Sequence, residues 1–170
     1  MKKLLLVIFL LKISFFVAQS ISINPPVNYF EAPFGRISNG HEKIKILKVI
    51  DQFMQAVNSK DKEIFNKILY KGINRIVTNI DNDSIRSTIV IDNDSSIANR
   101  MDPNKKEDFR ERYWDANVIT DGNIASVWAP YDFYLNGSFS HCGVDLFYLV
   151  KDDDAWKIAH FGYTRNKECK

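Results

Sequence analysis

The chain has 170 residues, with 23 Lys and Arg against 21 Asp and Glu, so its formal net charge is +2. A nearly balanced charge without a basic cluster gives little electrostatic reason to expect nucleic acid or an anionic membrane as a partner. The length suits one domain that buries its own core.

The first 20 residues, MKKLLLVIFLLKISFFVAQS, have the layout of a secretory signal peptide: a basic start, an apolar stretch, and small residues near the end. Lys12 interrupts the apolar run, whereas a membrane span needs about 20 apolar residues. We therefore expect cleavage near Gln19 or Ser20 and export to the periplasm or the medium, with no membrane partner afterwards. Cleavage removes three lysines and no acids, which leaves 20 basic against 21 acidic residues and a formal net charge of −1.

Two helices are expected at the start of the domain. Residues 21–41 contain prolines and glycines without a sustained period and predict an extended lead-in. A domain over residues 42–166 follows, with a short tail at 167–170. From Glu42 to Val57, apolar residues recur at steps of three and four, which predicts one apolar helix face. Ser59 or Asp61 can cap a second amphipathic helix.

The middle of the chain predicts a hairpin, and the element that follows it has two interpretations. Residues 73–80 and 85–92 are rich in β-branched side chains and flank the turn sequence DNDS. The polar stretch 92–101 is expected to be a loop. Asp102 and Pro103 can cap and open a further helix, and FRERYW, residues 109–114, can instead begin a strand.

The last third predicts four antiparallel strands over residues 116–120, 123–135, 138–150 and 156–165. Asp121-Gly122 and Asn136-Gly137 are strong hairpin signals, because both central positions of a type I′ turn need positive φ. Helices followed by a hairpin and a meander indicate an α+β domain whose helices cover one face of a curved sheet.

The helix pair, and the long strand pair that closes with WKI and a polar, aromatic tail, resemble the nuclear transport factor 2-like superfamily, which includes SnoaL-like and ketosteroid isomerase-like domains. Residues 121–165 resemble more narrowly the exported bacterial branch labelled as presumed lumazine-binding. The resemblance covers Glu42 to Arg165. It implies a cystatin-like cone, with N-terminal helices packed on a curved antiparallel sheet, more firmly than it implies an activity.

The hairpin turns also predict which side chains share a face of the sheet. With Leu135 opposite Ser138 and Val150 opposite Trp156, opposite residues lie on one face. That face would line a small-molecule pocket, since a few polar groups among aromatic rings are typical of such sites. The predicted lining residues are Trp128, Asp132, His141, Asp145, Phe147, Phe161, Tyr163 and Arg165. A one-residue bulge would invert part of this assignment.

Asp132, His141 and Asp145 are the candidate catalytic residues. A carboxylate opposite an imidazole would raise the histidine pKa and provide a general acid or base. The alternative is a cross-strand ion pair at the rim of the sheet, worth about 0.2–1 kcal/mol. Neighbouring strand residues point in opposite directions, so His141, Cys142 and Asp145 cannot converge on one metal ion. Neither a metal nor another cofactor is expected.

Cys142 and Cys169 are the chain's two cysteines. After export they could form a disulfide, worth about 3 kcal/mol in the chain-entropy model. Two free thiols are the alternative.

Three functions remain open on the sequence. The first is an exported domain that binds a small apolar or aromatic ligand. The second is an isomerase, dehydratase or hydrolase that uses the Asp-His acid-base pair. The third is a non-catalytic module that forms a homodimer through the outer face of its sheet.

Overall fold

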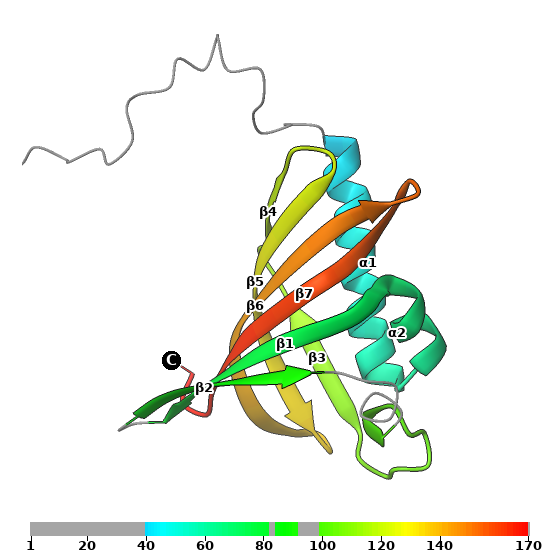
Figure 1. The fold of residues 1–170 in the computed structure, drawn as a ribbon. Coiled ribbons are helices and arrows are strands. Elements are labelled where there is room, and N and C mark those ends of the chain that lie inside the picture. The colour runs from blue at the N-terminus through cyan, green and yellow to red at the C-terminus, as the bar shows by residue number, and fades with distance from the viewer. Residues whose placement is uncertain (1–39, 82–83, 92–98, 170) are drawn as a thin grey trace, which may run out of the picture. The chain divides into compact units, whose positions relative to one another are not determined.

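The computed structural model describes residues 40–81, 84–91 and 99–169 as two helices and one sheet (Figure 1). The predicted signal peptide, nearly all of the lead-in and most of the 92–101 loop lie outside the described residues. The elements are α1 (Gly40–Ser59), α2 (Lys62–Ile68), β1 (Leu69–Asp81), β2 (Ser84–Ile91), β3 (Phe109–Tyr113), β4 (Asn117–Thr120), β5 (Ile124–Leu135), β6 (Ser138–Asp152) and β7 (Ala155–Asn166).

The seven strands form one curved sheet in the order β2-β1-β7-β6-β5-β3, and β4 also pairs with β5. All paired neighbours are antiparallel except β1 and β7, which run parallel. Both helices lie over the concave face (Figure 1). The predicted α+β architecture, with N-terminal helices on a curved sheet, is confirmed.

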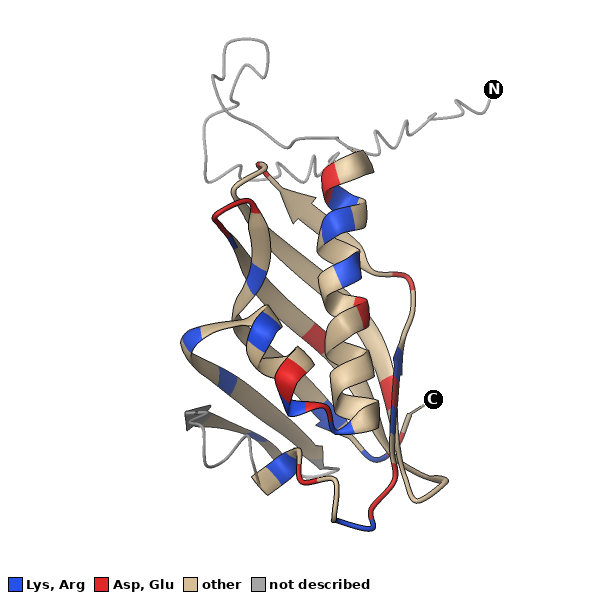
Figure 2. Ribbon diagram, turned by 90° about the vertical axis from the view of Figure 1, so that its right-hand side faces the viewer, with Lys and Arg blue, Asp and Glu red and all other residues tan. Residues whose placement is uncertain are grey.

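Helix α1 supplies the largest share of the core that covers this face. Its apolar stripe is buried as the helical period predicts, while lysines lie on its outer side (Figure 2). Phe53 is the centre of the contact: its ring lies 5.1 Å from that of Phe147 and 5.2 Å from that of Phe161, both nearly edge-on. Such ring pairs stabilise a core beyond the area they bury.

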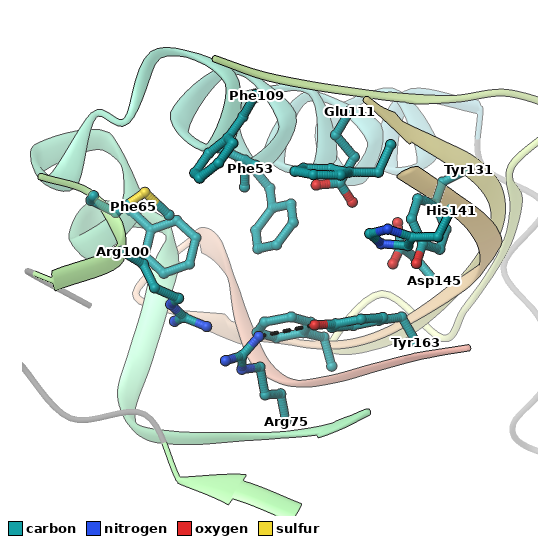
Figure 3. Close-up of a pocket in the computed structure, with 14 residues that line it drawn as sticks. Phe53, Phe65, Arg75, Arg100, Phe109, Glu111, Tyr131, His141, Asp145 and Tyr163 are labelled. Atoms are coloured by element: carbon teal, nitrogen blue, oxygen red, sulfur yellow. Dashed lines mark hydrogen bonds between the residues drawn. The ribbon is translucent and has the colours of Figure 1, made fainter. Parts of the chain in front are cut away.

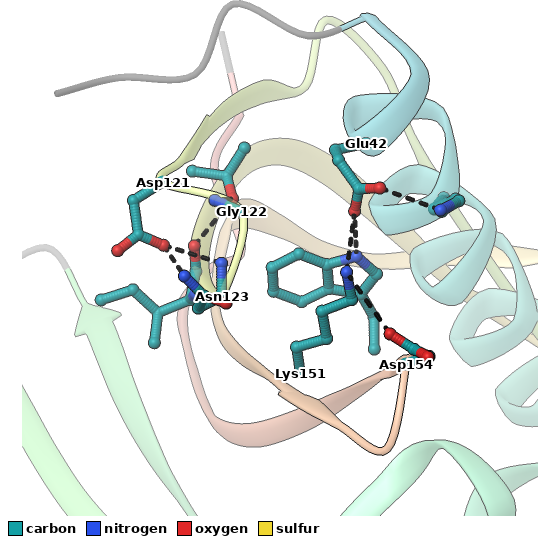
Figure 4. Close-up of polar contacts among 10 residues, drawn as sticks. Glu42, Asp121, Gly122, Asn123, Lys151 and Asp154 are labelled. Atoms are coloured by element: carbon teal, nitrogen blue, oxygen red, sulfur yellow. Dashed lines mark hydrogen bonds and ion pairs between the residues drawn. The ribbon is translucent and has the colours of Figure 1, made fainter. Parts of the chain in front are cut away.

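The start of α1 is attached to the far end of the sheet. The Glu42 carboxylate accepts hydrogen bonds from Trp156 Nε1 and Lys45 Nζ, each at 2.9 Å, and Lys151 Nζ lies 4.0 Å away (Figure 4). These hydrogen bonds lower the Glu42 pKa. At the other end of α1, Asp61 caps α2 by accepting a 2.9 Å hydrogen bond from the Ile64 amide.

The strands of the meander lie where the turn signals predict. Asn136 and Gly137 both have positive φ, 52° and 76°, as a type I′ turn requires. The Asp121-Gly122 turn is built differently: only Gly122 has positive φ, and the Asp121 carboxylate accepts hydrogen bonds from the Asn123 and Ile124 amides (Figure 4). This side-chain turn is typical of Asp.

Between the hairpin and the meander, the predicted helix at Asp102-Pro103 is wrong. Residues 102–108 form turns and extended chain, and the Asp102 carboxylate accepts a hydrogen bond from the Asn104 amide two residues on. Asp therefore closes a local turn instead of starting a helix. The alternative expectation is confirmed, because β3 begins at Phe109. No helix among the described residues is long and apolar enough to cross a membrane.

Candidate functional site

A cavity of about 210 Å³ lies between the helices and the concave face of the sheet (Figure 3). Helices α1 and α2, the five strands β1, β3, β5, β6 and β7, and the segment before β3 all contribute to its wall. The lining residues are Phe53, Val57, Phe65, Arg75, Arg100, Met101, Phe109, Glu111, Tyr131, Phe133, His141, Asp145, Phe161 and Tyr163.

Aromatic rings form most of the wall and contact one another. Phe53 packs against Phe65 with ring centroids 5.5 Å apart, and Phe161 stacks on Tyr163 at 6.5 Å. Tyr131 lies edge-on to Tyr163, and its hydroxyl donates a 2.9 Å hydrogen bond to the Thr164 carbonyl oxygen. These contacts between rings give the cavity a largely apolar surface.

Two carboxyl groups face this apolar space. Asp145, on β6, is 2% exposed, and within the described part of the chain its Oδ2 has no hydrogen-bond partner. Glu111 comes from β3, where Asn58 of α1 fixes its backbone: Asn58 Oδ1 accepts from the Glu111 amide and Asn58 Nδ2 donates to the Glu111 carbonyl oxygen. In Figure 3 both carboxyl groups point into the cavity.

Burial changes the chemistry of both acids. It raises the pKa of Glu111 to about 7, since the surrounding protein atoms remove much of the water that would stabilise the charge. Burial, followed by the negative charge of Glu111, raises the pKa of Asp145 well above its usual range. Both groups therefore hold their protons to a higher pH than ordinary carboxyl groups do, and Glu111 titrates near neutral pH.

His141 lies beside this pair as a neutral base. Burial, with a smaller contribution from the positive charge of Arg165, lowers the pKa of His141 to about 4. The imidazole stacks on Phe133 at 5.0 Å, and its Nδ1 lies 3.0 Å from Ser140 Oγ. This contradicts the expectation that a facing carboxylate raises the histidine pKa.

Two arginines line the opposite side of the cavity. Arg75 comes from β1, and its Nη1 donates a 3.1 Å hydrogen bond to the Tyr163 hydroxyl. Arg100 lies in the segment before β3 and points toward the same side in Figure 3. The cavity thus has an arginine side and a carboxyl side.

The expectation that Asp132 faces His141 is wrong because β6 contains a bulge. Tyr134 pairs with Phe139 as the tight turn predicts, but Phe133 then pairs with His141, so Ser140 is an extra residue. Asp132 is thereby on the other face, where Arg112 Nε donates a 2.9 Å hydrogen bond to its Oδ1. Asp132 is therefore half of a cross-strand ion pair, which was the alternative interpretation, with Arg112 as its partner.

Trp128 is displaced from the predicted pocket by the same bulge. It pairs with Leu146 on the outer face of the sheet and is 49% exposed. On β6 and β7 the predicted pocket residues lie on the predicted face of the sheet. The pairing between the two strands differs by two residues from the prediction, since Asp145 pairs with Tyr163 instead of Phe161. A shift of two residues preserves the face, whereas a shift of one reverses it.

Among the other predicted pocket residues, Phe161 and Tyr163 line the cavity. Phe147 is fully buried beneath Phe53 and belongs to the core. Arg165 is exposed and acts on the site through its charge. Cys142 and Cys169 form a disulfide with Cα atoms 6.2 Å apart, within the usual range for such bridges.

Glu111, Arg75 and Arg100 are site residues that the sequence analysis missed. A signal existed for Glu111: in FRERY it alternates with Phe109 and Tyr113, which marks a carboxylate on the apolar side of a strand. Arg75 carried no such signal, because the parallel pairing of β1 with β7 determines what it faces. Arg100 belongs to a stretch that was expected to be a polar loop. In the described ranges no group of three or more His, Cys, Asp or Glu side chains could hold a metal ion.

Comparison with solved structures identifies the architecture. A protein of unknown function with a cystatin-like fold from Nostoc punctiforme has a TM-score of 0.59 at 8% identity, over 75% of this chain and 93% of its own. An NTF2-like protein of unknown function from Shewanella baltica has a TM-score of 0.54 at 15% identity, over 78% and 99%.

The chain has the NTF2-like fold. A presumed dehydratase of the NTF2-like family from Streptomyces avermitilis also matches, with a TM-score of 0.55 at 13% identity, over 74% of this chain and 96% of its own. No protein-family model matches the sequence, and no curated protein does. The structural matches establish the NTF2-like fold. At identities this low they do not give the function, which has to be inferred from the side chains of the site.

Proposed function

We propose that the protein binds a small, partly apolar molecule in the cavity between its helices and the concave face of its sheet. The observation that carries this proposal is a space between helices and sheet that is lined by aromatic rings and a few polar groups. Drug-sized ligands occupy pockets of roughly 300–1,000 Å³. A cavity of about 210 Å³ therefore suits a smaller metabolite.

Filling the cavity tests this proposal. Val57→Phe places a ring in the space that the ligand would occupy, and it should abolish the rise in melting temperature that a bound metabolite causes. Ile85→Phe, the matched control, makes a similar change on β2, at a side chain that is 74% exposed. Metabolites retained by the wild type and the control, but absent from Val57→Phe, are read out by native mass spectrometry. Equal retention by all three proteins would reject the cavity as the binding site.

The carboxyl pair favours a second function, proton transfer on the bound molecule. An acid whose pKa lies near the working pH is well suited to donate and accept protons, and the pKa of Glu111 is about 7. Asp145 and the neutral imidazole of His141 line the same cavity as Glu111. In the enzyme hypothesis from the sequence, the pair was Asp132 and His141. The carboxyl pair Glu111 and Asp145 takes its place, because both of these side chains face the cavity.

Solvent exchange distinguishes an enzyme from a binding protein. A co-purified molecule incubated in heavy water with wild-type protein should gain deuterium at carbon if the pair transfers protons. Asp145→Asn should bind the molecule and leave it unlabelled. An unlabelled molecule with the wild type identifies a binding protein.

A further inference from the structure

The cavity has positively charged side chains on one side and acidic side chains on the other. Figure 3 places Arg75 and Arg100 on one side, with Glu111, His141 and Asp145 across the cavity from them. Rings lie between the two groups, so a molecule that fills the space contacts both. One end of that molecule then contacts two guanidinium groups, and its other end contacts two acids.

We propose that the ligand is an organic monoanion whose carboxylate is bound by Arg75 and Arg100, whose apolar body lies against the rings, and whose far end is neutral. This inference rests on the proposed function, since it names the chemical class of the molecule in the same cavity.

The arginine side fits a carboxylate for geometric reasons. A guanidinium remains charged at any relevant pH, and its planar set of donors matches the two oxygens of a carboxylate. The Tyr163 hydroxyl, held 3.1 Å from Arg75 Nη1, adds a polar group at the same place. The positive charges of Arg75 and Arg100 also act on the Tyr163 hydroxyl, where they oppose the rise in its pKa that burial causes. The positive charges of both arginines are therefore felt at the Tyr163 side chain, which lines the cavity.

The carboxyl side requires the other end of the ligand to be neutral. Asp145 is 2% exposed, and charges interact more strongly there than in water because the surroundings are poorly polarisable. A second anionic group would lie beside Glu111 and Asp145, which already disfavour each other's ionisation. A neutral group in place of the carboxylate would lose the charge-assisted hydrogen bonds of the two guanidinium groups. The cavity thus favours monoanions over dianions and neutral molecules.

Matched ligands test the charge preference directly. The probes are arylalkanoates of increasing chain length, the corresponding primary amides, and benzene-diacetates that carry a carboxylate at each end. Affinities are measured by isothermal titration calorimetry. The carboxylate should bind about tenfold or more tightly than its amide, since charge-assisted hydrogen bonds are stronger than neutral ones. The diacetate should bind more weakly than the matched monocarboxylate.

Three variants assign the preference to the arginines. Arg75→Gln and Arg100→Gln should each reduce the ratio of carboxylate to amide affinity. Arg86→Gln, an exposed position on β2, makes the same change in charge and should leave the ratio as in the wild type. A general disturbance of folding would weaken both probes equally and leave the ratio unchanged, so the ratio reports on anion recognition itself.

The outcomes separate this inference from the proposed function. Amides that bind as well as carboxylates, with binding still blocked by Val57→Phe, would overturn the monoanion and leave the cavity as the binding site. Binding that Val57→Phe does not affect would remove both proposals. An unchanged ratio in Arg75→Gln and Arg100→Gln would also overturn the assignment.

Discussion

The raised pKa of Glu111 results from where its side chain lies in the fold. Asn58 holds its backbone from the helix side, and alternation along β3 turns its carboxyl group inward with Phe109 and Tyr113. The cavity gives the group some contact with water, yet the surrounding rings raise its pKa to about 7. A carboxylate in such a place lowers the stability of the fold and is informative as a binding or catalytic group.

Replacing Glu111 should stabilise the protein at alkaline pH. The unfolded chain releases this proton near pH 4.5 and the folded chain near 7, so the free energy of unfolding falls as the pH rises between these values. Gln cannot ionise, and Glu111→Gln should exceed the wild type by on the order of 1–2 kcal/mol at pH 8, with a much smaller difference at pH 5.

Urea denaturation at both values of pH measures this difference. His141 acts in the opposite direction, because its lowered pKa makes stability rise between about pH 4 and 6.5, but it does so in both proteins and cancels. Glu107→Gln, the same substitution at an exposed loop position, is the control. A constant difference across the pH range would mean that Glu111 is solvated.

The disulfide fixes the last residues of the chain to β6. Cys169→Ser opens a bridge that spans 27 residues, so it should lower the free energy of unfolding by about 3 kcal/mol. The double variant with Cys142→Ser should be no less stable than the single one, because either change removes the same bridge. Additive losses would show that the two sulfurs contribute separately.

At the scale of elements, β6 departs from a regular strand where the site lies. The Ser140 bulge turns His141 inward and Asp132 outward, and Gly143 then lets β7 approach closely. A Cβ on Gly143 would lie 2.0 Å from the Thr164 carbonyl oxygen, which also accepts the hydrogen bond from Tyr131. These local features of one strand bring the polar groups of the site together.

Gly143→Ala should therefore disturb the sheet out of proportion to its size. The added methyl overlaps backbone atoms, which have little room to move, and overpacking typically costs about 1–3 kcal/mol. Gly40→Ala at the start of α1 is the matched control, since a Cβ there meets nothing within 4 Å. Thermal denaturation compares the two variants. Similar melting temperatures would show that β7 can move away from β6.

The sequence predicted elements better than it predicted the site, for a physical reason. Helical period and the Asn136-Gly137 turn are local signals, and they gave the helices and the meander closely. The face of a strand depends on every residue between the turn and the site, so the single extra residue at Ser140 moved Asp132 and Trp128 to the wrong side. Arg75 lies at the cavity because β1 pairs with β7. These strands are far apart in sequence, so no local pattern predicts the pairing.

At the scale of the whole molecule, export remains our proposal. Intact mass spectrometry of protein recovered from the producing cells should show a chain shortened at Gln19 or Ser20. Its mass should also be lower by two hydrogen atoms than that of the reduced chain, because Cys142 and Cys169 are joined. Full-length protein with both thiols free would contradict export.

The homodimer expected from the sequence stays a prediction as well. The outer face of the sheet exposes large apolar side chains, among them Trp128, Leu146 and Tyr148. Sedimentation equilibrium should give a dimer for the wild type and a monomer for Leu146→Glu. A wild-type monomer at all concentrations would reject self-association.

Strand order has a consequence for how the protein is made. The final strand, β7, lies between the early β1–β2 hairpin and β6, so a growing chain on the ribosome cannot join its two halves until β7 has emerged. Contacts between residues this far apart in sequence slow folding and leave apolar surface exposed in the meantime. A nascent chain that ends before Ala155 has two separate pieces of sheet, and the cavity between the helices and the sheet can form only after β7 has been made.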